Sequence, residues 1–313
     1  MWRYAIRRAL WALPILVGVC LLTFVLFYAA VSPQQMARSH IGTKAPTDQQ
    51  IGAWLKRHGY DKPLSTQFKK HLSELLLFRF GASDATGEPI WARLSEGIGP
   101  SALVAAMVFF STLILGISAA LLLAWLRGTA ADPLGVLACI LLMSVPYVVV
   151  ILTGQFVFGK LLRWFPITGY QPGLGTLRFA LMPAIVGTIG GVGSAIRFYR
   201  SVVLEELGQD YIRAARARGV PERRILAVHA LRNASVPILT NAVLSLPFLL
   251  MGSLLLESFF GIPGIGTFTV DAIQNQDFAV VRAMVFLGAV LYVIGAVLAD
   301  IACALADPRI RLE

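Results

Sequence analysis

Long apolar runs separated by polar segments constrain the fold of this chain more than any other feature. A helix needs about 20 predominantly apolar residues to cross a bilayer, and several segments of the sequence reach or approach that length. They occupy residues 10–31, 102–126, 134–161, 179–196, 236–256 and 281–305. The sequence therefore predicts an all-α polytopic membrane protein with six transmembrane helices.

Composition favours a membrane protein over a soluble one. Charged residues make up 14% of the chain and hydrophobic residues 57%, whereas a soluble domain carries about 25% charged residues. The net charge of +10 raises the alternative of nucleic-acid binding. Membrane proteins, however, concentrate Lys and Arg at the cytoplasmic ends of their helices, so we expect no nucleic-acid partner.

Basic residues near the N-terminus predict the orientation of the chain. Arg3, Arg7 and Arg8 precede the first apolar run, which is longer than the about 7–15 apolar residues of a cleavable signal sequence. We therefore expect a retained first helix and a cytoplasmic N-terminus, with six spans returning the C-terminus to the same side. The predicted parts are a first helix within 1–31, a long extracytoplasmic loop at 32–98, a five-helix part at 99–305 and a cytoplasmic tail at 306–313.

The long loop at 32–98 shows helical periodicity. Thr47 or Asp48 is suited to cap a helix that Gly59 would end, and a second stretch begins near Pro63. The apolar positions that would share a helix face are Ile51, Trp54 and Leu55 in the first stretch, and Leu64, Phe68, Leu72 and Leu75 in the second. We expect two short amphipathic helices on the outer surface rather than a plain tether.

Two features inside the apolar runs predict a kink and close packing. Pro146 removes a backbone hydrogen bond from the third run, which predicts a kink there. The fourth run holds glycines at 187, 190, 191 and 193. A phosphate-binding loop would need a preceding strand and a following Lys-Ser/Thr. Because neither is present, the glycines indicate close helix–helix packing.

No arrangement of residues points to catalysis. The sequence holds no His-Glu-x-x-His motif, no Gly-x-x-x-x-Gly-Lys-Ser/Thr phosphate loop and no supported Ser/His/Asp order. Cys20, Cys139 and Cys303 lie in separate apolar runs, where we expect them to pack as small hydrophobic residues. We predict a non-catalytic chain with no metal site and no cofactor of its own.

Acidic and conformationally special residues in the runs are candidates for a transport pathway. Glu257 and Asp300 lie near span ends, and ionisable residues in a membrane are functional candidates by default. The segment 257–266 is too apolar for a plain solvent loop, which indicates an outward turn, with a re-entrant segment as the alternative. The full set of gating or pathway candidates is Pro146, Glu257, Phe260, Pro263, Gly264, Gly266 and Asp300.

The loop at 202–233 is a long basic segment between two apolar runs, divided by a Gly-Val-Pro turn at 219–221. Before this turn, four residues at helical spacing share one face. They are Tyr211, Ala214, Ala215 and Arg218. Small alanines allow a partner to approach the backbone, and the flanking aromatic and cationic side chains are suited to anchor it. The alternative, a basic face against anionic lipid, explains the charge but neither the alanines nor the turn.

This loop resembles the cytoplasmic loop of bacterial ATP-binding-cassette (ABC) importer permeases. Arg213-Ala214-Ala215-x-x-x-Gly219 is similar to their Glu-Ala-Ala-x-x-x-Gly motif, with Arg in place of the leading Glu. Asp210-Tyr211 and the His-Ala-Leu-Arg-Asn at 229–233 resemble the dipeptide/oligopeptide branch. Further similarity to its first, B-type, subunit is carried by Tyr60-Asp61-Lys62-Pro63-Leu64, Phe80-Gly81-Ala82-Ser83, Pro166-Ile167-Thr168-Gly169, Pro263-Gly264-x-Gly266 and Asp307-Pro308-Arg309.

The resemblance implies a type I ABC importer permease in the bacterial inner membrane, in contact with membrane lipid. The implied partners are a second, homologous permease subunit, two ATPase subunits that bind ATP and Mg²⁺, and an extracytoplasmic substrate-binding protein. The residues implied to couple this chain to the ATPase are Tyr211, Ala214, Ala215, Arg218 and Gly219.

The resemblance also implies a di- or oligopeptide cargo, with nickel chelates and cationic antimicrobial peptides as alternatives. A self-sufficient secondary carrier belongs to a different class, and it would be expected to place an ionisable residue near mid-membrane, where this sequence offers none. A membrane-bound scaffold or sensor whose basic loop binds lipid is a third alternative.

Overall fold

The computed structural model describes residues 13–26, 32–41, 46–250 and 253–306. Within these ranges the regular secondary structure is helical, apart from one isolated β-bridge between Ala82 and Pro89. It divides into two compact units. The core unit comprises residues 98–267 and 294–313, and the N-terminal unit comprises residues 2–97 and 268–293. The predicted cytoplasmic tail, the basic N-terminus and both ends of the first predicted span lie wholly or partly outside the described residues.

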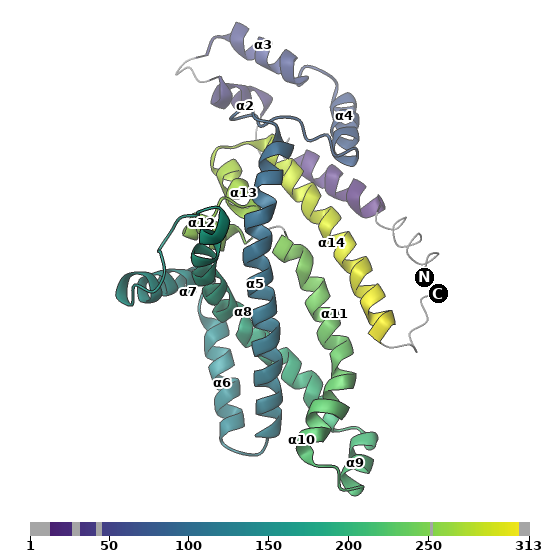
Figure 1. Ribbon diagram of the computed structural model, residues 1–313. Coiled ribbons are helices and arrows are strands. Elements are labelled where there is room, and N and C mark those ends of the chain that lie inside the picture. Colours follow the sequence, from purple (N-terminus) through teal and green to yellow (C-terminus); the bar gives the residue numbers. More distant parts are fainter. Residues whose placement is uncertain (1–12, 27–31, 42–45, 251–252, 307–313) are drawn as a thin grey trace. The chain divides into compact units, whose positions relative to one another are not determined.

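The helices of the core unit, some of which extend into the N-terminal unit, follow one another with short connections (Figure 1). They are α5 (Ile90–Trp125), α6 (Ala131–Ser144), α7 (Tyr147–Gly154), a π-helical segment (Gln155–Leu161), a 3₁₀ turn (Gly173–Gly175), α8 (Thr176–Leu207), α9 (Asp210–Ala217), α10 (Glu222–Arg224), a second π-helical segment (Ile225–Ala230), α11 (Leu231–Leu250), α12 (Leu254–Phe260), α13 (Ile265–Gln274) and α14 (Phe278–Ala306).

Three of the described helices are long and apolar enough to cross a membrane: Ile90–Trp125, Thr176–Leu207 and Phe278–Leu298. The count rises to four if α6 and the bent segment after it form one broken span. The first predicted span is described only at Leu13–Leu26, a shorter apolar helix, and α11 is not among the helices that pass. A multi-span helical protein is therefore confirmed, whereas the number six stays a prediction.

The third predicted span is sharply broken at Pro146. Its two halves, α6 and the segment Tyr147–Leu161, meet at 94°. Val145 is extended (φ −83°, ψ 125°), the conformation that a residue before proline prefers because the proline ring obstructs the helical one. The predicted kink is confirmed, and it is a full change of direction rather than a bend.

The glycines of α8 face three different neighbours at close range. A Cβ added at Gly187 would lie 2.7 Å from Val108 of α5, and one at Gly190 would lie 2.5 Å from Tyr147 of α7. At Gly193 it would lie 3.0 Å from the carbonyl oxygen of Cys139 in α6. The predicted role in close helix packing is confirmed, because a side chain at these positions would hold the helices apart.

The N-terminal unit contains the helix Leu13–Leu26, α2 (Pro33–His40), α3 (Asp48–His58), α4 (Leu64–Leu76) and the first turns of α14. Both predicted amphipathic helices are confirmed. The Thr47 side chain caps α3 by accepting a hydrogen bond from the Gln50 N–H, and Gly59 ends it at φ +77°. The sequence reasoning missed α2, which Ser32 and Gln35 open with a reciprocal capping box.

Asp277 ties the loop before α5 to the start of α14. Its carboxylate accepts hydrogen bonds from the Ser83 hydroxyl and from the Asp84 N–H (3.2 Å), and it caps α14 through the Val280 N–H (3.2 Å). Asp84 reciprocates by accepting from the Ala279 N–H (3.2 Å). These bonds join segments about 190 residues apart in sequence, which explains why 268–293 belongs to the N-terminal unit.

Candidate functional site

The predicted helix in the basic loop is present as α9, and backbone hydrogen bonds fix the turn that follows it. The Val220 N–H donates to the Ala215 carbonyl (3.2 Å) and the Gly219 N–H to the Arg216 carbonyl (2.9 Å). With Gly219 in the left-handed region at φ +76°, this is a Schellman motif. Gly219 is thus needed for its conformation, because an L side chain is strained at such a φ.

An ion pair closes the same turn. Arg216 on α9 contacts Glu222 on α10 through two bonds, Nη2 to Oε1 at 2.5 Å and Nε to Oε2 at 3.2 Å. The Arg216 hydrogen bond is the main cause that lowers the pKa of the Glu222 carboxyl. Bidentate arginine–carboxylate pairs are geometrically specific, so this pair holds α9 and α10 in a defined relative orientation despite its partial exposure.

Tyr211 is anchored at the start of α9. Its hydroxyl donates to the Glu206 carboxylate at 2.5 Å. Partial burial, followed by this hydrogen bond to an anion, raises the pKa of Tyr211 to about 12. The phenol therefore stays protonated at all physiological pH values and holds the first turn of α9 to the end of α8.

The structure divides the predicted coupling residues into two groups. Tyr211, Ala214, Arg218 and Gly219 are exposed. Ala215, in contrast, is only 8% exposed and packs with Ile212 into the core unit. The sequence reasoning placed Ala215 on the partner-facing side, but its spacing from Ile212 puts it on the inner side of α9. A partner that approaches α9 meets Ala214 rather than Ala215.

Beneath α9 lies a continuous hydrophobic cluster that reaches four other helical segments. Its members come from α5, α8, α9, α11 and the π-helical segment before α11. They are Ala120, Ala124, Tyr199, Val203, Leu207, Ile212, Ala215, Ile225, Leu226, Ala230, Ala234 and Ile238. Because packed side chains transmit displacement with little compression, α9 is mechanically connected to the apolar helices α5 and α8.

Two polar contacts reinforce this end of the core unit. The Arg223 guanidinium lies over the Trp125 ring at 5.5 Å, which joins α10 to the end of α5. Arg200 of α8 forms a bidentate pair with Asp132 at the start of α6, at 2.9 and 2.7 Å. The latter pair is largely buried, so losing either partner would leave an uncompensated charge.

Glu257, predicted from sequence as a pathway acid, organises the Gly-rich turn after α12. It is 1% exposed, and its carboxylate accepts from the Gly266 N–H (2.8 Å) and the Ser253 N–H (3.2 Å). Ser101 of α5 also hydrogen-bonds Glu257 and accepts from the Ile265 N–H (2.8 Å). Any Cβ at Gly264 would overlap the carboxylate, so the Pro-Gly-x-Gly turn is built around this acid.

The other pathway candidates are only partly brought together with Glu257. Phe260 is buried in α12, and its carbonyl accepts from the Gly169 N–H (2.9 Å). Pro263 is exposed in the same turn, and Pro146 is exposed at the break before α7. Asp300 lies half-buried in the last part of α14.

The basic loop and the Glu257 turn lie at opposite ends of the core unit. Ser101 of α5 contacts the Glu257 turn, and Trp125 of α5 contacts α10. At about 1.5 Å per residue, the helix between them spans about 36 Å. That distance exceeds the about 30 Å hydrocarbon core of a bilayer, so this part of α5 is long enough to separate the two features by the thickness of a membrane.

Between these ends, α5, α8 and α11 enclose a cavity of about 370 Å³. Its lining mixes apolar side chains with polar ones from all three helices: Thr112, Ser194, Asn241 and Ser245. The Thr112 hydroxyl is buried and has no hydrogen-bond partner among the described residues. The sequence reasoning missed this set. The four-residue spacing of Asn241 and Ser245 within an apolar run places both on one helix face, and this pattern could have indicated the polar lining from sequence.

Together these features define a polytopic helical membrane protein with an exposed helix that packs against its apolar helices and a largely apolar cavity that carries a few polar side chains. The family model for binding-protein-dependent transport system inner membrane components matches residues 112–312, and the model for the N-terminal part of such components matches residues 1–92.

Individual relatives align over almost the entire chain. A protein of Brucella abortus (strain 2308), provisionally named as a peptide transport system permease, is 34% identical over 314 residues that cover 98% of each chain. The oligopeptide transport system permease protein AppB of Bacillus subtilis (strain 168) is 31% identical over 317 residues, which cover 98% of this chain and 99% of the relative. This chain belongs to the family of inner-membrane permease components of binding-protein-dependent ABC transport systems. The resemblance seen in the sequence is confirmed.

Proposed function

We propose that this chain is the permease subunit of an ATP-driven importer of di- or oligopeptides, and that α9 couples it to a separate ATPase. The observation that carries the proposal is the seating of α9, whose outer side presents Tyr211, Ala214 and Arg218 while its inner side packs on α5, α8 and α11. A helix built in this way is suited to receive a force on one side and pass it to spanning helices on the other.

The coupling mechanism follows from the rigidity of this end of the core unit. ATP-driven closure of the partner ATPases would displace α9 and α10 together, because Arg216–Glu222 and the Schellman turn hold them as one body. The cluster below would carry the motion into α5 and α8 as a rigid-body rocking. In this proposal the chain itself hydrolyses nothing, and ATP and Mg²⁺ bind to the partner subunits.

The cavity between α5, α8 and α11 is the proposed place for passing cargo. Thr112, Ser194, Asn241 and Ser245 provide hydroxyl and amide groups, which are able to exchange hydrogen bonds with any peptide backbone. Uncharged partners of this kind do not select a particular side chain. The lining therefore suits a pathway for varied peptides, and the names of the relatives support the same cargo.

The proposed assembly pairs this chain with a second, homologous permease subunit, two ATPase subunits and a substrate-binding protein. The family's dependence on a binding protein supports the last of these. We place α9 and both termini on the cytoplasmic side. The long loop at 32–98 and the turn at 257–266 are each assigned to the extracytoplasmic side, as predicted from the sequence. The positive-inside rule supports this orientation, because the short basic segments gather around α9.

A charge placed on the outer side of α9 tests the coupling role. Ala214→Glu puts bulk and negative charge on an exposed position, so the spans and the cluster below stay intact. We expect the complex to lose co-purifying ATPase and at least ten-fold of its peptide-stimulated ATP hydrolysis. Ala215→Glu is unsuitable because it would bury a carboxylate in the cluster.

The matched control is Ala53→Glu on α3, which is also an exposed helical alanine but lies in the N-terminal unit. It should leave ATPase association and turnover near the wild-type level. If Ala214→Glu inserts normally and retains both association and coupled turnover, α9 is not the coupling helix.

A further inference from the structure

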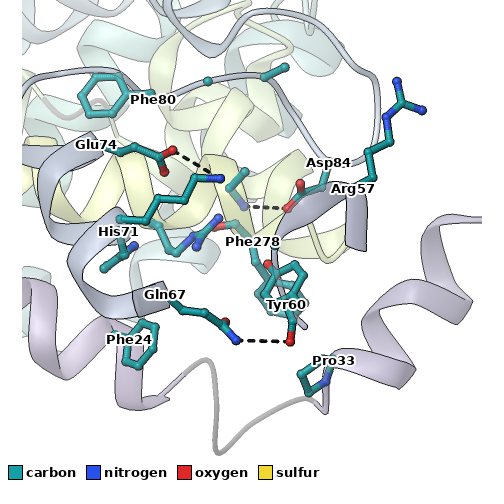
Figure 2. A pocket seen from close by; sticks show the side chains of 16 residues that line it. Phe24, Pro33, Arg57, Tyr60, Gln67, His71, Glu74, Phe80, Asp84 and Phe278 are labelled. Atoms are coloured by element: carbon teal, nitrogen blue, oxygen red, sulfur yellow. Dashed lines mark hydrogen bonds and ion pairs between the residues drawn. The ribbon is translucent and has the colours of Figure 1, made fainter. Parts of the chain in front are cut away.

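A pocket of about 230 Å³ lies within the N-terminal unit (Figure 2). All of its walls belong to this unit: α3, α4, the segment after α4, the start of α14 and Phe24 of the apolar helix Leu13–Leu26. Its volume far exceeds the about 10–15 Å³ that a single water requires. The pocket therefore has room for a polar group of several heavy atoms.

His71 contributes an unsatisfied polar atom to this pocket. Its side chain on α4 is 5% exposed, yet Nε2 has no hydrogen-bond partner among the described residues. One hydrogen bond to the Cys20 backbone engages the ring, which leaves Nε2 as the open position. Buried polar atoms in proteins are almost always paired, so a ligand group or bound solvent is expected at Nε2.

Arg282 contributes a positive charge without a counter-ion. It lines the pocket one turn after the start of α14, where its Nε donates to the Phe278 carbonyl (3.1 Å). Its terminal nitrogens have no acceptor among the described residues, although the side chain is half-buried. Arg57, on the rim, also lacks a carboxylate partner in the described part of the chain.

The carboxylates that line the pocket are already engaged. Glu74 pairs with Lys70 at 3.7 Å, and Asp84 accepts from the Ala279 N–H at 3.2 Å. The half-buried guanidinium of Arg282 is left for an anion from outside the chain. Planar guanidinium groups bind phosphate and carboxylate in bidentate fashion.

The surroundings of the pocket indicate where the anion comes from. Arg282 stands in the first turns of a helix apolar enough to cross a membrane, which is the depth of the lipid headgroups. Phe24 near the end of the other apolar helix adds a ring to the wall, and the neighbouring Leu21, Leu22 and Val25 are exposed. The pocket thus joins a cationic polar part to an apolar surface, as an amphiphilic ligand requires.

We propose that this pocket binds the phosphate-bearing headgroup of a membrane phospholipid. The phosphate is held by Arg282, a headgroup oxygen or hydroxyl meets Nε2 of His71, and the acyl chains run along the apolar helix Leu13–Leu26. The guanidinium suits this headgroup because its planar set of N–H donors matches the oxygens of a phosphate. A lipid held there would fix α4 against the start of α14 within the N-terminal unit.

Lipid retention by the purified transporter complex tests the proposal. The complex, reconstituted with a phosphatidylglycerol/phosphatidylcholine mixture and washed in detergent, is examined by native mass spectrometry. We expect wild type to retain one phosphatidylglycerol per copy of this chain and Arg282→Gln to retain at least ten-fold less. Arg79→Gln is the matched control, because Arg79 is exposed in the same unit and does not line the pocket.

Each remaining outcome overturns the proposal. Retention by Arg282→Gln at the wild-type level shows that the pocket does not hold the lipid, and equal loss in Arg79→Gln shows that general positive charge holds it. If inorganic phosphate or glycerol 3-phosphate at equal concentration displaces the lipid, the ligand is a soluble phosphate instead. Equal melting temperatures of the two variants in lipid-free detergent establish that both are folded.

Discussion

Ala214 and Ala215 are chemically identical neighbours in opposite environments. Ala214 is exposed on α9, whereas Ala215 lies in the cluster that joins α9 to α5 and α8. A motif that contains two alanines thus combines two physical requirements. In the proposed coupling role, Ala214 is small so that a partner is able to approach. Ala215 is small so that α9 is able to lie close to its own core.

At the same scale, His71 makes the N-terminal unit sensitive to acid. The pKa of His71 is lowered to about 4. Burial is the main cause, the positive charge of Arg282 also lowers the pKa, and a hydrogen bond to the Cys20 backbone raises it in part. In the unfolded chain histidine titrates near its ordinary pKa of about 6.5. Between these two values the unfolded state binds a proton and the folded state does not, so stability falls as the pH drops through this window and is fully present above it.

We therefore expect the N-terminal unit to lose on the order of 2 kcal/mol at pH 5 relative to pH 7, at about 1.4 kcal/mol per unit of pKa difference. Amide hydrogen exchange of α4 in lipid-free detergent, corrected for its intrinsic pH dependence, measures this loss. His71→Leu removes the titrating group. The protection of the α4 amides from exchange should therefore change less between pH 5 and pH 7 in this variant than in the wild type. Equal pH dependence in wild type and variant would contradict the assignment.

At the scale of single elements, α8 shows how small residues position a membrane helix. Gly187, Gly190 and Gly193 each meet a different helix, α5, α7 and α6 respectively. The sequence pattern predicted close packing but not the partner at each position, because the break at Pro146 turns α7 away from α6 by 94°.

Gly190→Ala should destabilise the core unit by about 1–3 kcal/mol, the usual cost of overpacking. The added Cβ would lie 2.5 Å from the Tyr147 ring, and that ring is held by packing near Val104 and Phe260 and by a hydrogen bond to Ser253. Gly191→Ala is the matched control, because its Cβ would lie 3.9 Å from Thr112. Thermal unfolding of the purified complex should show a loss for Gly190→Ala and none for Gly191→Ala.

At the scale of the whole molecule, the core unit separates two functional regions by the length of one spanning helix. The basic loop contacts α5 at Trp125, and the Glu257 turn contacts it at Ser101. The proposed importer requires such a separation, because energy would enter on one side and cargo on the other. The alternating motion proposed for the pathway must therefore run through α5 and the helices packed on it.

The proposed orientation predicts which side of the membrane each region meets. In a chain whose native cysteines are replaced, Ala53→Cys should react with a membrane-impermeant maleimide added to intact spheroplasts. Ala214→Cys should react only after the membrane is opened. Both positions are exposed, so a difference in labelling reports sidedness rather than burial. The reverse labelling pattern would show that the topology is opposite to the proposed one. Labelling of both positions from outside would contradict the proposal that they lie on opposite sides of the membrane.

The sequence alone predicted the membrane helices, several helix ends and the family of this protein, because each depends on local chemistry. Apolar runs predict membrane helices, because backbone groups in lipid must pair within the segment. Thr47 and Gly59 set the ends of α3, and the Gly-Val-Pro turn sets the end of α9. The motif in the basic loop indicated the family that the comparisons then established. In each case the cause lies within a few residues of its effect.

Only the tertiary structure decided which distant residues meet. It placed Ala215 in the core, built the Pro-Gly-x-Gly turn around Glu257, and gathered Thr112, Ser194 and Asn241 around one cavity. It also joined His71 to Arg282 across about 210 residues of sequence. Periodicity identifies the buried side of a helix but not the neighbour it packs against, because that choice depends on the shapes and polar groups of several helices at once.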